Sequence, residues 1–310
     1  MDAITGLLDG PRARGAFVLR SILAPPWALR IEDHAPLTLV ALVRGRAHVR
    51  ADDGPGHELR PGDVAVLRGP DAYTVADDPG TPPQVVIGPD QRCAGVDGGE
   101  PPGMTHFGVR TWGNDPAGPD VLVTGTYQLR SETSRRLLAA LPPLIVQSAE
   151  SLEAPAVTWL AREAARDDPG QEAVLDRLLD LVLVATLRAW FSRADAAPPG
   201  WYRGAADPVV GPVLRAIQYG PEQPWTVATL AATAGVSRAA LARRFTDVVG
   251  EPPMTFLTHW RLALAADLLL EPDTTLTSIA HRVSYGGPYA LSAAFTRVRG
   301  MSPKEYRRAA

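Results

Sequence analysis

A nine-residue segment near the C-terminus occurs twice, fifty residues apart, and this repeat limits what the end of the chain can fold into. Residues 245–253 read FTDVVGEPP and residues 295–303 read FTRVRGMSP, so Phe, Thr, Val, Gly and Pro recur at matching places. Further upstream, Leu-Ala at 230–231 matches Ile-Ala at 279–280. An internal repeat of this length indicates one supersecondary unit that is used twice.

The first copy has the pattern of two short helices joined by a tight turn. Apolar residues recur at spacings of three and four on both sides of Gly235, as in amphipathic helices. Gly235 adopts the positive φ of such a turn without steric cost, and Ser237 is suited to cap the next helix. This pattern predicts a helix-turn-helix, whose second helix enters the major groove of DNA. An ordinary helical hairpin fits one copy equally well, but two copies favour DNA binding.

Three longer segments carry a resemblance to a known family. They read WTVATLAATAGVSRAALARRF at 225–245, MTFLTHWRLALAADLL at 254–269, and IAHRVSY followed by LSAAFTRVRGMSPKEYR within 279–307. Together they resemble the C-terminal DNA-binding domain of the AraC/XylS family of bacterial transcription regulators. The resemblance implies an all-α DNA-binding domain at 207–310.

In that family a long helix separates two helix-turn-helix units. The resemblance places the connecting helix at 255–270, with Leu262, Ala265, Ala266 and Leu269 as its buried stripe, and the two units at 226–247 and 276–299. At 1.5 Å per residue this helix would be roughly 24 Å long. Such a spacer suits recognition helices that enter successive turns of the major groove, ~34 Å apart.

The two units are not expected to read DNA equally well. The family's base-reading positions fall on Ala239, Ala242 and Arg243 in the first unit, where Arg243 can pair bidentately with guanine. In the second unit the turn glycine is Ser284 and the usual recognition-helix arginine is Ala293. We therefore expect the second unit to contact mainly phosphates. The residues predicted to contact DNA are Ser237, Arg238, Ala239, Ala242, Arg243, Arg244, Pro288, Tyr289, Ser292 and Arg297, with Arg299 as a further phosphate contact.

Charge is unevenly spread along the 310 residues, although the net charge is only −3. Residues 205–310 hold 11 basic and 8 acidic residues, and the preceding 204 hold 20 and 26. A basic C-terminal third fits a DNA-binding module joined to a different domain. No signal peptide is visible, and the most apolar segment, 178–187, is too short to span a bilayer. The sequence therefore predicts a cytoplasmic protein without a membrane partner.

The region from about residue 16 to 130 has a different character, because short apolar runs alternate with Gly, Pro and Asp. This pattern predicts a small β-barrel or sandwich. Residues 88–120 form a long Gly- and Pro-rich loop that is either disordered or a lid. The order of the motifs resembles the cupin-like sensor domain of one AraC/XylS subgroup. Strands are expected at 17–24, 27–31, 37–43, 63–68, 84–88 and 121–129, with a hairpin at 47–57.

The resemblance to cupins raises the question of a metal, since many cupins bind one through histidines. Thr38 and Tyr73 stand where two of those histidines would be, so we expect no metal, no other cofactor and no enzymatic activity. A cupin-type metalloenzyme with a DNA-binding tail is the first alternative. The second is an oxidant sensor that acts through Cys93, the single cysteine, although a lone thiol has no resolving partner.

A barrel without a metal can still hold a small molecule, because barrel mouths are common ligand sites. Its candidate lining residues can equally be plain core, which suits Trp27 and Leu29 best. Either His34 or Arg30 is expected near the rim. The predicted effector-binding residues are Trp27, Leu29, His34, Thr38 and Tyr73, with Leu42 as a further lining candidate.

Helices are expected at 131–141, 151–166 and 171–191, which completes a sensor and dimerisation domain at 1–193. The last of them is apolar nearly all round, so we expect one face on the barrel and the other on a second copy of the chain. The alternative is that residues 151–166 of the same chain cover the second face of this helix. The Ala-, Pro- and Gly-rich stretch at 194–206 is the predicted linker.

Taken as a whole, the sequence predicts an α+β multidomain protein with a cupin-like barrel, a helical dimerisation segment and an all-α domain with two helix-turn-helix motifs. The predicted function is a sequence-specific transcription regulator controlled by a small-molecule effector. Its expected partners are double-stranded DNA, the effector and a second copy of the chain, and RNA polymerase is a further candidate.

Overall fold

The computed structural model describes residues 17–309 except 90, 128–131, 133–134, 136–137, 153–154, 194 and 197. The chain divides into two compact units. Among the described residues, the N-terminal unit comprises those within 17–129 and 141–196, and the C-terminal unit comprises those within 130–140 and 197–309. Residues 130–140 therefore group with the C-terminal unit, although their neighbours in the sequence on both sides belong to the other.

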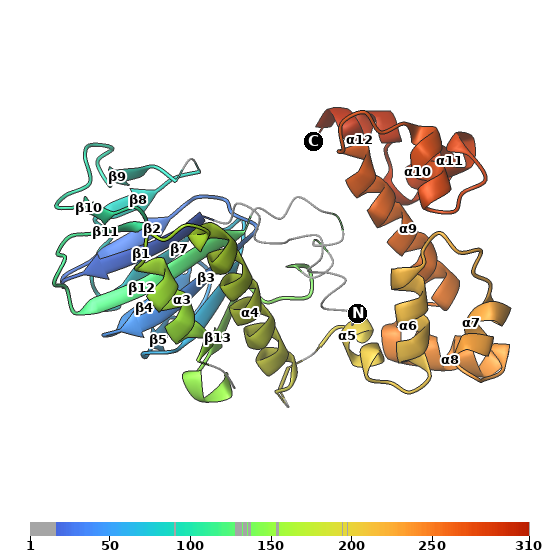
Figure 1. Ribbon diagram of the computed structural model, residues 1–310, viewed down its shortest axis with the longest axis horizontal. Coiled ribbons are helices and arrows are strands. Elements are labelled where there is room, and N and C mark those ends of the chain that lie inside the picture. The colour runs from blue at the N-terminus through green and yellow to red at the C-terminus, as the bar shows by residue number, and fades with distance from the viewer. Residues whose placement is uncertain are drawn as a thin grey trace. The chain divides into compact units, whose positions relative to one another are not determined.

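The N-terminal unit is built from two sheets (Figure 1). One has the strand order β10-β11-β1-β12-β3-β6-β13, and the other has the order β5-β4-β7-β2-β8-β9. The first sheet contains β1 (Phe17–Leu23), β3 (Leu37–Arg44), β6 (Val64–Arg68), β10 (Thr105–Gly108), β11 (Thr111–Gly113), β12 (Asp120–Tyr127) and β13 (Leu144–Gln147). The second contains β2 (Ala28–Ile31), β4 (Ala47–Ala51), β5 (His57–Leu59), β7 (Tyr73–Ala76), β8 (Val85–Ile87) and β9 (Cys93–Gly95).

Two helices, α3 (Ala156–Ala164) and α4 (Gln171–Phe191), contact the seven-stranded sheet, and Figure 1 shows them along its face. Strand β3 reads LTLVALVR and is buried at six consecutive positions, because one face meets the core between the sheets and the other meets α3. At Gly125 of β12, a β-carbon would lie 2.4 Å from Leu179 of α4. The glycine therefore lets α4 lie directly on the sheet.

The strand predictions at 17–24, 27–31, 37–43, 63–68, 84–88 and 121–129 are confirmed, as is the hairpin at 47–57, where β4 pairs with β5. Strands β7 and β13 were not predicted. The 88–120 segment is neither a bare loop nor a simple lid, because it contains β9, β10 and β11. The helices predicted at 151–166 and 171–191 appear as α3 and α4, whereas most of the one predicted at 131–141 lies outside the described residues.

The C-terminal unit is helical, as predicted, and is organised around α9 (Figure 1). The first half of α9 contributes to one apolar core and the second half to another, and Leu264 packs against both. The predicted stripe of Leu262, Ala265, Ala266 and Leu269 is buried. The helices are α5 (Gly200–Ala205), α6 (Val210–Tyr219), α7 (Val227–Thr233), α8 (Arg238–Val249), α9 (Pro253–Leu269), α10 (Leu276–Arg282), α11 (Pro288–Arg299) and α12 (Pro303–Ala309).

Part of the predicted linker at 194–206 is the helix α5, which packs on α6 and α8. Its glycines allow close approach of other atoms, since a β-carbon at Gly200 would lie 2.3 Å from the carbonyl oxygen of Val249. A β-carbon at Gly204 would lie 2.8 Å from Leu214. The glycines of this stretch thus allow tight helix packing. Composition alone does not distinguish such packing from a flexible linker.

The two helix pairs close their turns in the same way. The N–H of Val236 donates to the carbonyl of Ala231 at 3.0 Å, and that of Tyr285 donates to Ala280 at 2.8 Å. The residue before each donor is left-handed, with φ of 67° at Gly235 and 56° at Ser284. Only the first of these is a glycine, so the second turn keeps its geometry against an unfavourable backbone conformation. No helix among the described residues is long and apolar enough to cross a membrane.

Reciprocal substitutions at these turns test this conformational cost. Ser284→Gly is expected to raise stability by ~0.5–1 kcal/mol, because relief of the left-handed strain exceeds the added unfolded-state entropy. Gly235→Ser is expected to lower stability by about 1 kcal/mol, since a β-carbon there meets open space and only the backbone is strained. Thermal unfolding of the full-length variants measures both effects. Equal and unchanged midpoints would contradict the assignment of strain.

Candidate functional site

Helix α8 presents a basic outer surface at the first helix pair. Ser237 caps it by accepting a hydrogen bond from the N–H of Ala240 at 3.2 Å, while Leu241 and Phe245 are buried in the core. The opposite face is left to solvent. Arg238, Ala239 and Arg243 are exposed there, and Ala242 is half-buried.

Arg244 is an exception among the cations of α8, because its guanidinium is held by Asp207. Nε and Nη2 of Arg244 donate to one Asp207 oxygen at 2.9 and 2.7 Å. The other oxygen accepts from the N–H groups of Val209 and Val210, both at 2.9 Å, at the start of α6. Burial opposes ionisation of Asp207, but these donors together lower its pKa. This ion pair joins α8 to α6, which the sequence did not reveal.

Helix α11 occupies the corresponding place in the second pair and begins with Pro288, whose missing N–H suits a first helical turn. Tyr289 is 90% exposed, an unusual state for an aromatic side chain. Arg297 is exposed and Ser292 is half-buried. Arg299 differs from them because its guanidinium bonds to the carboxylate of Glu132.

The N-terminal unit holds a cavity of about 40 Å³ between its two sheets. It adjoins a recess of about 420 Å³, and the two share Leu19, Ile87, Gln91 and Trp112. The cavity walls are mostly apolar, with a few polar groups placed among them. Its further lining residues are Ser21, Leu29, Ile31, Asp33, Val40, Tyr73, Val75, Leu122, Thr124 and Thr126.

The polar groups of the cavity are largely paired with one another. The amide of Gln91 donates to Asp33 at 3.0 Å, and the indole of Trp112 donates to Ser21 at 2.8 Å. Burial and the nearby Asp33 carboxylate raise the pKa of Tyr73, whose hydroxyl bonds with Thr38. Tyr73 therefore stays neutral and can offer a hydrogen bond to a ligand.

Only two of the predicted effector-binding residues, Leu29 and Tyr73, line this cavity. Trp27 does not, since it is fully buried and its indole donates to Asp120 at 2.8 Å. Leu42 belongs to the surrounding core, and Thr38 is hydrogen-bonded to Tyr73 without lining the cavity itself. The alternation of Thr124 and Thr126 along β12 was a usable signal for this lining, because both side chains face the same side of the strand.

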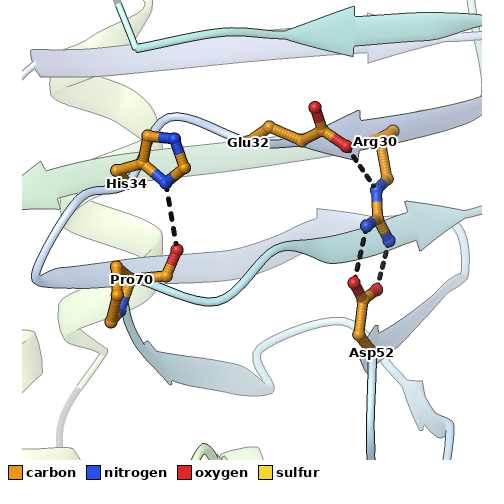
Figure 2. Close-up of polar contacts among 5 residues, drawn as sticks. All are labelled: Arg30, Glu32, His34, Asp52 and Pro70. Atoms are coloured by element: carbon orange, nitrogen blue, oxygen red, sulfur yellow. Dashed lines mark hydrogen bonds and ion pairs between the residues drawn. The ribbon is translucent and has the colours of Figure 1, made fainter.

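The two residues predicted near the rim, His34 and Arg30, are not among those that line the cavity, and Figure 2 shows their polar contacts. His34 is exposed and has φ of 54°, and its ring Nδ1 lies 3.4 Å from the carbonyl oxygen of Pro70. The Arg30 guanidinium faces Asp52, with Nη2 at 2.6 Å from Oδ2, and its Nε lies 3.1 Å from Glu32 (Figure 2). Hydrogen bonding to Asp52 raises the pKa of Arg30, and its charge is engaged by Asp52 and Glu32.

Cys93 lines the outer recess and is half-buried. Burial raises the pKa of its thiol, which disfavours the reactive thiolate form. This environment does not support the oxidant-sensor alternative. Within the part of the chain that the structure describes, no group of three or more His, Cys, Asp or Glu side chains is placed to hold a metal ion.

Comparison with known proteins places both units in families. A cupin family model matches residues 2–192, and a helix-turn-helix domain model matches residues 230–309. A Streptomyces lividans protein named as an AraC-like transcription regulator is 35% identical, over 99% of this chain and 98% of its own length. The chain belongs to the AraC-like transcription regulators.

Further relatives agree with this assignment. A second AraC-like regulator, from Streptomyces antibioticus, is 33% identical over 99% of both chains. Among solved structures, the DNA-binding domain of AdpA in complex with a target DNA is 36% identical, covering 34% of this chain and 93% of that one, with a TM-score of 0.31. This AraC-like regulator therefore combines a cupin N-terminal domain with a helix-turn-helix domain of the AraC type.

Proposed function

We propose that this protein regulates transcription by binding a specific DNA sequence and that a small molecule in its cupin domain controls this binding. The observation that supports the proposal best is the pair of equivalent helices, α8 and α11, on one connecting helix. Both follow a left-handed turn, and both leave arginines exposed on the outer surface. Each pair is thus proposed to act as a helix-turn-helix, with α8 and α11 as recognition helices.

The two recognition helices are proposed to divide the work. On α8, Arg243 is exposed and in no ion pair among the described residues, so it is free to pair with guanine. Arg238, Ala239 and Ala242 are proposed to complete that surface, with Ser237 at its edge. On α11, Pro288, Tyr289, Ser292 and Arg297 are proposed to contact the sugar-phosphate backbone. Arg244 contributes less, because Asp207 already holds it.

Two matched arginine substitutions test this division. Arg243→Ala is expected to lose discrimination at one base pair, at a cost of ~1–3 kcal/mol. Arg297→Ala is expected to weaken binding to every sequence alike and to reduce the salt dependence by about one phosphate contact. Selection from random duplexes with the wild-type protein supplies the site, and titrations at several salt concentrations measure both variants. Identical behaviour of the two would contradict the division.

The cavity lining favours an uncharged, mainly apolar effector. Its walls carry no cationic side chain among the described residues, and its one carboxylate, Asp33, repels anions. The cavity is too small for a whole effector, so we propose that an apolar end enters it while the rest occupies the adjoining recess. Arg92 and His106 also line that recess, but they lie outside the inner cavity, where the apolar end is placed.

Paired probes of equal chain length test the effector class. 1-Octanol is expected to raise the unfolding midpoint, because a ligand that binds only the folded state stabilises it. Octanoate is expected to have little effect, since its charge opposes the Asp33 carboxylate. Thr124→Met, which extends an apolar side chain into the cavity, should remove the effect of octanol. A larger shift with octanoate than with octanol would contradict the proposal.

Helix α4 is proposed to join two copies of the chain. Leu175, Leu179 and Leu183 are buried against the unit, whereas Val174 is 45% and Leu181 is 41% exposed on the opposite face. Exposed apolar residues seven positions apart form a stripe that a second α4 can cover. The alternative, coverage by α3 within one chain, leaves this stripe in solvent.

A single charge on the stripe tests the homodimer. Leu181→Glu is expected to shift the protein to monomers at micromolar concentration, because the carboxylate would be buried unpaired in the interface. Glu172→Gln, an exposed change in the first turn of the same helix, should leave the assembly unchanged. Sedimentation velocity distinguishes these outcomes. A wild-type protein that is already monomeric would contradict the proposal.

No catalytic residue and no cofactor form part of this proposal. RNA polymerase stays a predicted partner that rests on the family resemblance.

A further inference from the structure

A buried carboxylate holds the end of the second recognition helix. Glu132 lies in segment 130–140, which belongs to the C-terminal unit, and it is only 5% exposed. Its side chain bonds to the Arg299 guanidinium, accepts a hydrogen bond from the Tyr306 hydroxyl at 2.8 Å, and lies 2.7 Å from Arg135. Its backbone N–H donates to Asp267. Glu132 therefore touches α9, α11 and α12 at once.

The carboxylate is charged despite its burial. Burial alone would raise the pKa of Glu132, but hydrogen bonds from Arg299 and Tyr306 outweigh it and lower the pKa. A buried charge is stable only when it is paired. The same pairing restrains Arg299, whose side chain is 23% exposed, whereas Arg297 on the same last turn of α11 is exposed.

The internal repeat shows that Arg299 is particular to the second copy. Its counterpart fifty residues earlier is Val249, next to which Gly200 of α5 packs closely. At α8 this position is met by a helix of the same unit, since a β-carbon at Gly204 of α5 would lie 3.5 Å from Cγ2 of Val249, and Val249 packs against the first apolar core. At α11 the corresponding position is met by segment 130–140 through an ion pair. The contact at α8 is therefore fixed by packing. The contact at α11 is an ion pair, in which water or another anion can take the place of the carboxylate.

We propose that Glu132 competes with a DNA phosphate for Arg299 and so restrains the second recognition helix. The guanidinium presents the same fork of N–H donors to a carboxylate and to a phosphate, so one group excludes the other. Release of Glu132 adds one phosphate contact to the DNA-bound state. This inference rests on the proposed DNA-binding function and extends it to a regulatory contact.

The chain offers a direct covalent route from the effector cavity to this contact. Strand β12 lines the cavity with Leu122, Thr124 and Thr126 and ends at Tyr127. Glu132 follows only five residues later. Five residues span at most ~18 Å when fully extended, so the proposed effector site and the proposed DNA contact are close neighbours along the chain.

Non-specific DNA binding tests the competition without a known operator or effector. With full-length protein and a random-sequence 30-base-pair duplex, Glu132→Gln is expected to increase affinity about three- to tenfold at ~0.1 M salt. The slope of log affinity against log salt should steepen by ~0.9, the value for one added phosphate contact. Arg299→Ala should not bind more tightly than the wild type, because it removes the arginine for which Glu132 and a phosphate compete. Glu132→Gln/Arg299→Ala should lose the whole gain.

The control variant is Asp273→Asn, which removes one negative charge from an exposed position of the same unit. Asp273 has φ of 62°, a backbone conformation that asparagine tolerates. The affinity gain of Asp273→Asn should be smaller than that of Glu132→Gln, and it should not depend on Arg299. An unchanged or weakened affinity of Glu132→Gln would overturn the competition, as would a gain that persists without Arg299. If the wild-type protein binds no duplex at low salt, the DNA-binding proposal itself fails.

Discussion

The C-terminal unit depends on the burial of one helix along its whole length. Phe256 and Trp260 of α9 stack with parallel rings in the first core, and the small residues Ala265 and Ala266 let the second pair approach closely. Because Leu264 packs against both cores, a shift of one pair disturbs the packing of the other. The spacing of the two helix pairs therefore depends on α9, whose seventeen residues rise about 25 Å.

The N-terminal unit follows a related constraint, in which one sheet is covered on both faces. Helix α4 needs Gly125 to lie against β12, and the opposite face of the same strand lines the cavity. The indole of Trp112 and the hydroxyl of Ser21 satisfy each other at the cavity wall. The cavity wall consequently presents mainly apolar atoms, because few of its hydrogen-bond donors are left unpaired. Strand β12 thus packs against α4 with one face and lines the cavity with the other.

Local patterns in the sequence predicted the elements, and long-range partners decided most of the site. The repeat around Phe245 and Phe295 predicted both helix pairs because spacing and turn chemistry are local signals. The partners of Trp27 and Arg244, which are Asp120 and Asp207, lie 93 and 37 residues away, so local patterns did not reveal them. The helix α5 within the predicted linker likewise packs on α8, which is distant in the sequence. Its glycines look flexible until the helices that approach them are known.

Carboxylates decide which arginines of the C-terminal unit are available to DNA. Asp207 holds Arg244 and also caps α6, so that ion pair belongs to the framework of the first helix pair. Glu132 retains Tyr306 and Arg135 as partners if Arg299 leaves, so its burial does not forbid release. Only Glu132 lies on a segment whose chain continues into the N-terminal unit at both ends. Of the two pairs, it is the one proposed to exchange with DNA phosphate, and control of that exchange requires that an effector favour one of its two states.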